Sequence, residues 1–253
     1  MKSKAFTVIL FIMLLFTACE KSSDEDQTFT TEEYLDIGMP DYKEIWSLKD
    51  YKNACAILDN LKTFKPLSLP RKDSKRSGVY FKRIINPENL SFLVEESIPL
   101  KERALQIQQY VDIQGYLISI YTDIENTEQY YNRELIDLYI FGLTIGQNML
   151  DLGQRINESV DEEDLSMQYA YQSIQDTYIT MVLFVLGNQK KTSLFEERDL
   201  LRLTDFITNS LFLNQGWLEP AAVEDIKHGV QMVIENSASE QIKNKYNMLV
   251  EEL

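Results

Sequence analysis

The chain has 253 residues, with 40 acidic and 25 basic side chains, so its formal net charge at pH 7 is −15. This charge disfavours binding of the folded body to nucleic acid or to an anionic bilayer surface, and we expect no nucleic-acid partner. The length allows one large domain or two small ones, each with an apolar core.

Residues 1–19 have the composition of a secretory signal. Lys2 and Lys4 form a charged start, residues 5–16 form an apolar run, and the small residues Thr17 and Ala18 follow. This order is typical of a signal peptide. The apolar run is shorter than the roughly 20 residues that a membrane-spanning helix needs. We therefore predict a signal peptide over residues 1–18.

Cys19 comes directly after Thr17 and Ala18, and this arrangement resembles the lipobox of bacterial lipoproteins. The resemblance implies that the Cys19 thiol receives a diacylglycerol and that the chain is cut before Cys19. It also implies that the new amine is acylated with a fatty acid such as palmitate. Two or more acyl chains give a stable anchor. The expected location is the bacterial outer membrane, facing the periplasm or the cell surface.

Residues 19–40 are predicted to form a flexible tether behind the lipidated cysteine. Residues 20–28 combine low hydrophobicity with dense charge, which is typical of disordered segments. The acidic cluster at residues 24–26 looks like the surface-export signal of some Gram-negative lineages. A solvated linker that faces the periplasm has the same composition, so both interpretations stay open.

Residues 41–253 predict an all-α domain, a single antiparallel bundle of about seven to eight helices. Ser47 and Asp50 form a capping box before a first helix, whose apolar stripe includes Cys55. Asn86 and Pro87 are typical of a second helix start, over residues 88–96. Between these elements, apolar and polar side chains come closest to alternating over residues 78–85, and we predict an extended arm there. Cys55 is expected to be a buried small side chain.

Longer helices are expected from Pro99 onward. Apolar spacing near 3.6 predicts helices over residues 99–125 and 131–156, with a recap at residues 126–127, and a cap at Asp161 starts another that ends before Gly187. A second capping box at residues 193–196 starts the next helix, and the last two are predicted from residue 219 and over residues 240–252. The pair Gly142 and Gly146 predicts a close helix crossing. We find no repeat of solenoid period, so a bundle is favoured over a repeat array.

The residues that carry most enzyme chemistry are scarce. His228 is the only histidine, which excludes sites that need two imidazoles, such as ferritin-like di-iron centres or the zinc proteases. Asp225 stands three residues before it, and we interpret the pair as an ordinary helix surface. There is no glycine-rich phosphate loop and no nucleophile elbow. We therefore expect no metal, no cofactor and no catalytic residue.

A basic loop is predicted over residues 62–83, where eight basic side chains accompany the single acid Asp73. It is either a docking arm for an anionic partner (a glycan, a lipid head group or an acidic protein) or a loop that folds back and neutralises its own acidic bundle. The candidate partner-binding residues in this loop are Arg71, Lys72, Lys75, Arg76, Lys82 and Arg83.

Tyrosines are abundant on the central helices, and three of them are candidates for a ligand groove: Tyr130, Tyr131 and Tyr169. Aromatic rings with phenol groups suit carbohydrate. The sequence as a whole predicts a binding or scaffolding module of the envelope, held by its lipid anchor, with a protein or glycan partner. The alternatives are a glycan- or small-molecule-binding lipoprotein that uses the tyrosines, and a hydrolase that uses two carboxylates alone.

Overall fold

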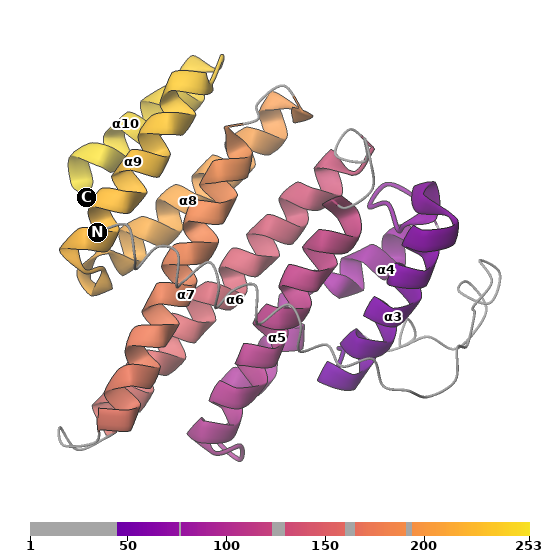
Figure 1. The fold of residues 1–253 in the computed structure, drawn as a ribbon, viewed down its shortest axis with the longest axis horizontal. Coiled ribbons are helices and arrows are strands. Elements are labelled where there is room, and N and C mark those ends of the chain that lie inside the picture. The colour runs from indigo at the N-terminus through magenta and orange to yellow at the C-terminus, as the bar shows by residue number, and fades with distance from the viewer. Residues whose placement is uncertain (1–44, 76, 123–129, 160–164, 191–193) are drawn as a thin grey trace.

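The structure is a computed structural model that describes residues 45–75, 77–122, 130–159, 165–190 and 194–253, without the side chains of 156, 157, 159 and 165–171. These residues form an all-α bundle, as the sequence predicts (Figure 1). Eight α-helices lie within them: α3 (Leu48–Phe64), α4 (Ser77–Ile84), α5 (Leu100–Thr122), α6 (Asn132–Ser159), α7 (Leu165–Gln189), α8 (Glu197–Asn214), α9 (Pro220–Asn236) and α10 (Glu240–Glu252). Three short 3₁₀ helices join them: η2 (Pro66–Ser68), η3 (Pro87–Val94) and η6 (Gln215–Trp217).

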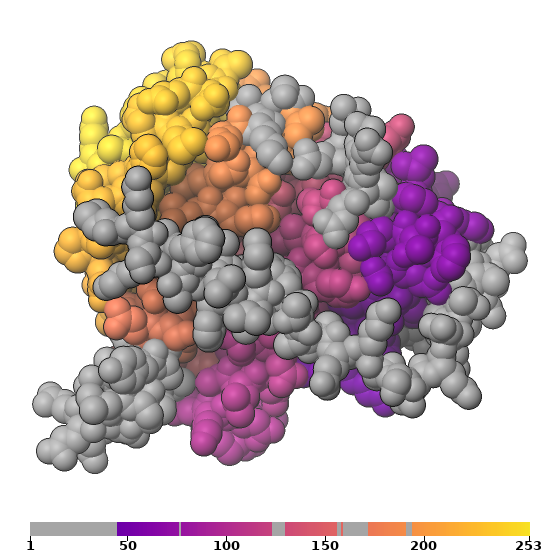
Figure 2. Space-filling model, viewed as in Figure 1, coloured from indigo at the N-terminus to yellow at the C-terminus, as the bar shows by residue number. Residues whose placement is uncertain are grey.

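The helices form two layers that follow the chain order from one edge of the molecule to the other (Figure 1). Helices α3, α5, α7 and α9 lie in one layer, and α4, α6, α8 and α10 lie in the other. Within the layers α3 contacts α5, α7 contacts α9, and α8 contacts both α6 and α10. Figure 2 shows the same order on one face, from α3 at one edge to α9 and α10 at the other. Each helix therefore packs mainly against helices close to it in sequence.

Helix α6 is central and contacts α5, α7 and α8. The predicted close crossing at its two glycines is confirmed. A Cβ atom at Gly142 would lie 3.3 Å from Gln114 Cγ on α5, and one at Gly146 would lie 3.0 Å from Tyr178 Cδ2 on α7. The two positions let three helix backbones approach closely around the core, which offsets the conformational cost of glycine inside a helix.

The start of the domain is held by buried hydrogen bonds. The predicted capping box is confirmed: the Asp50 N–H donates to Ser47 Oγ at 3.4 Å, and the Ser47 N–H donates to Asp50 Oδ2 at 2.8 Å. Asn86 caps η3 as expected, although this element is a 3₁₀ helix. Cys55 is buried in α3, as predicted. Asn89 of η3 donates to Tyr51 Oη of α3 at 2.8 Å, which fixes the two elements against each other.

The extended arm predicted over residues 78–85 is wrong, because residues 78–84 belong to α4. Tyr80, Phe81 and Ile84 are all buried, and their spacing is that of one helix face. Short apolar runs do not distinguish a strand from a buried helix, which explains the error. Gly78 is needed where α4 starts, because a Cβ atom there would lie 2.6 Å from Lys72 O.

The basic loop over residues 62–83 also needs correction. Lys62 lies in α3, and Lys82 and Arg83 lie in α4, so the segment between η2 and α4 is much shorter than expected. The second capping box is corrected as well. Helix α8 starts at Glu197, and its N-cap Glu196 makes no side-chain capping bond, while Ser193 lies outside the described residues.

Several predictions concern residues that the structure does not describe. The signal peptide at residues 1–18, Cys19 and the tether at residues 19–40 all lie outside the described residues, as do the caps at residues 126–127 and Asp161. Among the helices that are described, none is both long enough and apolar enough to cross a bilayer.

Candidate functional site

A short non-helical segment, residues 69–75, lies against the start of α6, and we call it the strap. The Lys72 N–H donates to Glu134 Oε1 at 2.7 Å, and Glu134 is buried. The Arg71 guanidinium donates to the backbone oxygen of Tyr130 at 2.9 Å. The strap is therefore bonded to α6 through both its backbone and its side chains.

Six charged side chains of alternating sign connect the strap to α6 and α8: Asp73, Arg133, Asp199, Arg202, Asp137 and Lys72. We call them the ion network. Lys72 Nζ lies 2.7 Å from Asp137 Oδ2, and Asp137 also pairs with Arg202. Arg133 pairs with Asp73, and its Nε lies 3.5 Å from Asp199 Oδ2. Arg202 Nη1 lies 3.7 Å from Asp199 Oδ1, so the charges neutralise one another in a chain.

The protonation of Lys72 reflects its partly buried position. Burial lowers the pKa of the Lys72 ammonium from its usual value, and Arg202 lowers this pKa further, while Asp199 opposes the shift. Acids of α6 and α8 thus offset only part of the cost of burying the Lys72 charge. This arrangement favours the interpretation in which the basic segment neutralises its own bundle.

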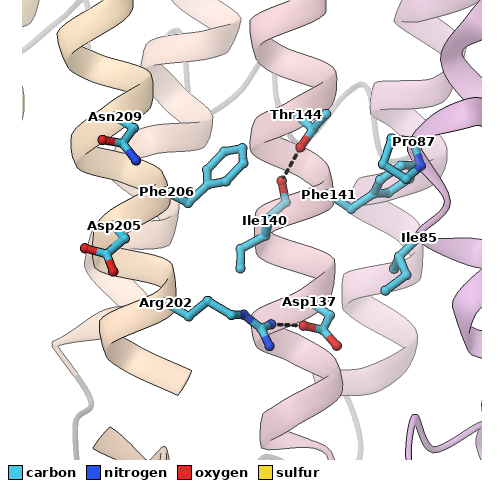
Figure 3. A pocket seen from close by; sticks show the side chains of 10 residues that line it. All are labelled: Ile85, Pro87, Asp137, Ile140, Phe141, Thr144, Arg202, Asp205, Phe206 and Asn209. Atoms are coloured by element: carbon cyan, nitrogen blue, oxygen red, sulfur yellow. Dashed lines mark hydrogen bonds and ion pairs between the residues drawn. The ribbon is translucent and has the colours of Figure 1, made fainter. Parts of the chain in front are cut away.

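A shallow groove of about 430 Å³ lies beside the ion network, with α6 as its floor (Figure 3). The floor residues are Asp137, Ile140, Phe141 and Thr144. One wall is formed by α8, with Arg202, Asp205, Phe206 and Asn209. The opposite wall is the turn between α4 and η3, with Ile85 and Pro87. In Figure 3 the Phe206 ring points from α8 toward α6, and Arg202 reaches toward Asp137 across one end.

The groove has the chemistry of a binding surface. The middle of the groove is apolar, and the two opposite charges at one end, Asp137 and Arg202, are paired with each other. Asp205 on the rim pairs with Lys245 of α10 at 2.5 Å. Hydrolysis by two carboxylates needs one of them as a protonated acid, whereas both acids of the groove are ion-paired with basic side chains. The geometry favours recognition of an apolar group over acid–base chemistry.

The predicted partner-binding residues have different environments. Lys72 is bonded to α6, and Arg71 donates to Tyr130 O just before this helix. Lys75 and Lys82 are exposed, and Arg83 is half-buried. Arg76 lies outside the described residues. Of the five described residues, Arg71 and Lys72 therefore have partners within the domain itself.

The predicted tyrosine groove needs a correction at Tyr131, which is only 1% exposed. Its phenol donates to Pro66 O at 2.9 Å and accepts from the Leu69 N–H at 3.1 Å, so it fixes the segment before the strap. Tyr130 is half-exposed, and the side chain of Tyr169 lies outside the described residues. A residue with its ring in the core does not line a ligand groove.

The groove residues themselves escaped the sequence analysis. Ile140 and Phe206 are each half-buried and pack against the core. The apolar spacing of α8 includes Phe206 in its inward stripe, so the pattern gives no sign that the ring borders a groove. Among the described residues, no group of three metal-ligating side chains gathers at the groove or elsewhere.

Asp137→Ala is expected to lower the free energy of unfolding by about 2 kcal/mol, because it leaves Lys72 and Arg202 without their shared acid. Asp137→Ala combined with Lys72→Met should cost about 1 kcal/mol less than the sum of the two single changes. Urea unfolding of the four proteins measures this coupling. Lys243→Met, which breaks the exposed pair with Glu240, is the control and should cost less than about 0.5 kcal/mol. If the double variant instead loses the sum of the two single losses in unfolding free energy, Lys72 and Asp137 do not interact and the ion network is contradicted.

Comparison of the chain with models of protein families, with curated proteins and with solved structures finds no match in any of the three.

Proposed function

We propose that this chain is a lipoprotein of a bacterial envelope whose helical body binds a partner without transforming it. The observation that carries the binding part is the groove on α6, which is apolar in the middle and has its charges paired at one end. Sites that recognise a partner combine apolar contact with a few polar groups that fix orientation. The partner that we propose is a protein.

The anchoring part of the proposal rests on the sequence alone. Residues 1–19 have the order of a lipoprotein signal, and acyl chains on Cys19 supply the membrane affinity. The acidic body then stays in water at the outer membrane, on the periplasmic or the outer face, because its charge repels anionic head groups. The tether at residues 19–40 separates the body from the bilayer.

In the bacterial envelope, the wild-type chain should sediment with membranes, and Cys19→Ala should shift it to the soluble fraction because the acyl chains are lost. A photo-crosslinking amino acid at Asn209, on the groove rim, should give a distinct adduct in membranes. The same amino acid at Gln109, exposed on α5 in the other layer, is the control and should give none.

Three results would count against the proposal. The first is a wild-type chain that stays soluble with an unmodified thiol at Cys19. The second is equal crosslinking from positions 209 and 109, which would show no preference for the groove. The third is turnover of a substrate by the purified chain, which would show an enzyme.

A further inference from the structure

Four large apolar side chains are exposed near the end of α8: Phe212, Leu213, Trp217 and Met248. We call them the apolar strip. Leu213 is 73% exposed and Met248 is 67% exposed. Large exposed apolar patches mark interaction sites on soluble proteins. Tryptophan, in particular, is enriched among residues that dominate binding energy.

The apolar strip continues the groove along α8. Phe206 and Leu213 are seven residues apart, so they lie on nearly the same face of the helix. The ion pair between Lys245 and Asp205 fixes the register of α10 against α8, and the two helices run in the same direction (Figure 1). Three residues beyond Lys245, Met248 therefore comes level with Thr208, next to Asn209 at the end of the groove.

The charges around the apolar strip are acidic. Glu219 follows Trp217 closely in the chain, with its carboxylate 3.4 Å from Gln172 Nε2 of α7. Glu251 and Glu252 end α10, at the level where α8 carries Phe212. All three acids are exposed. Lys245, a base on the same helix, is already paired with Asp205. A partner that covers the strip thus meets an apolar centre with negative charge at its border.

We propose that the groove and the apolar strip form one docking surface for a short, basic, amphipathic α-helix of a partner protein. This inference deepens the proposed function and rests on it. The partner helix lays an apolar face along α8 and places Lys or Arg side chains toward Glu219, Glu251 and Glu252. Such helices bind grooves through apolar residues spaced three, four and seven apart.

The length of the surface selects a helix over a smaller ligand. From Arg202 to Leu213 the face of α8 extends for about 16 Å, which matches about three turns of a partner helix. A molecule confined to the groove leaves the apolar strip exposed. An anionic bilayer is disfavoured by the acids at the border.

The test uses the two tryptophans of the full chain, reconstituted in neutral phosphatidylcholine vesicles. Trp46 is buried, so a change in emission on binding reports Trp217. The probe is a synthetic peptide of roughly 14 residues, with leucines at helical spacing and lysines elsewhere. It should bind saturably and shift the Trp217 emission to shorter wavelength. A twin peptide with glutamate for lysine and a scrambled peptide should bind at least about tenfold more weakly.

Matched variants locate the binding. Leu213→Asp and Met248→Asp should each weaken the lysine peptide about tenfold or more. Leu105→Asp is the control, because Leu105 is 60% exposed on α5 in the other layer, and it should change the affinity less than about twofold. Glu251→Lys with Glu252→Lys should weaken the lysine peptide and strengthen the glutamate peptide.

Other outcomes overturn the proposal. Equal binding of all three peptides, or equal loss in the Leu105 variant, shows nonspecific adhesion. A Trp217 shift with anionic vesicles alone, abolished by Leu213→Asp, makes the strip a membrane contact. A shift that depends on protein concentration alone makes it an interface between two copies. If peptides fail but position 209 still crosslinks in membranes, the helix is rejected and the binding function stands; loss of both rejects both.

Discussion

Asn89→Ala is expected to lower the free energy of unfolding by about 4 kcal/mol, because Asn89 joins three segments inside the core. Its Oδ1 accepts from the Trp46 N–H at 2.7 Å, and its Nδ2 donates to Tyr51 Oη at 2.8 Å and to Arg83 O at 2.7 Å. Truncation leaves the buried Trp46 N–H without its acceptor, and an unpaired buried group costs about 1–3 kcal/mol. It also removes one bond each from Tyr51 Oη and Arg83 O, which keep Ile84 O and the Asn86 N–H as partners, and each lost bond costs about 1 kcal/mol. Urea unfolding measures this loss of free energy, as a lower midpoint with an unchanged dependence of the free energy on urea concentration.

Two further variants separate hydrogen bonding from packing at this position. Asn89→Leu fills a similar volume without the polar groups, so its cost should stay close to that of alanine. Asn188→Ala is the matched control, since its exposed amide donates only to Phe184 O of the same helix, at 2.9 Å. It should cost less than about 0.5 kcal/mol. A cost at Asn89 that equals the control would show that the buried bonds contribute little.

Alkaline pH is expected to unfold the domain, because buried tyrosines resist ionisation in the folded state. Burial raises the pKa of Tyr178 to about 12, although hydrogen bonds to Ser210 and Asn214 oppose the shift. Burial also raises the pKa of Tyr110 to about 12, with a smaller contribution from Asp50. The pKa values of Tyr51 and Tyr246 are raised by burial as well.

Whether stability rises or falls with pH depends on which state, folded or unfolded, holds the tyrosine proton more tightly. In the unfolded chain a tyrosine ionises near pH 10, whereas folded Tyr178 keeps its proton to about pH 12. The folded state therefore binds more protons in this window, and its stability falls as pH rises. Tyr178 alone should cost about 2–3 kcal/mol over these two pH units. Lys72 acts in the opposite direction, since its pKa is lowered on folding. It is one group set against several buried tyrosines, so the stability still falls.

Urea midpoints at several values from about pH 9 to about pH 12, with tyrosinate absorbance, measure this effect. Tyr178→Phe removes one ionising group and should flatten the alkaline loss. Ser210→Ala is its control, because it removes the partner at 2.5 Å but keeps the phenol, so the steep loss should remain. A stability that stays constant up to about pH 12 would contradict the burial of these rings.

The elements that were predicted well are those with local signals. The last helix matches residues 240–252 because Ser239 caps it and apolar residues recur along one face. Pro220 starts α9 as expected. Local hydrogen bonds and periodicity decide these ends, so they can be read without tertiary information.

The errors arise where tertiary contacts override local patterns. Asn132 Nδ2 donates to Leu194 O at 3.0 Å. This bond holds Leu194 against the start of α6, so Leu194 lies outside α8, which starts at Glu197. Helix α7 continues past Gly187 to Gln189, whose buried amide donates to Thr204 Oγ1 and accepts from Tyr246 Oη. These partners are distant in sequence, and no local motif predicts their contacts.

The candidate site was the least predictable part. Asp137 and Arg202 meet across 65 residues, and Lys72 joins them from a third segment. Acids and bases on helix surfaces are common, so their pairing becomes visible only when the layers are assembled. The groove is likewise built from α6, α8 and the turn at Ile85 and Pro87.

The strap also bears on the order in which the domain assembles. Neighbouring helices pack through contacts that are close in sequence, which form quickly. The ion network instead needs α8 before Lys72, Asp137 and Arg202 can meet. We expect these charges to pair after the folding barrier is crossed. Weakening them should then leave the folding rate nearly unchanged and shorten the lifetime of the native state.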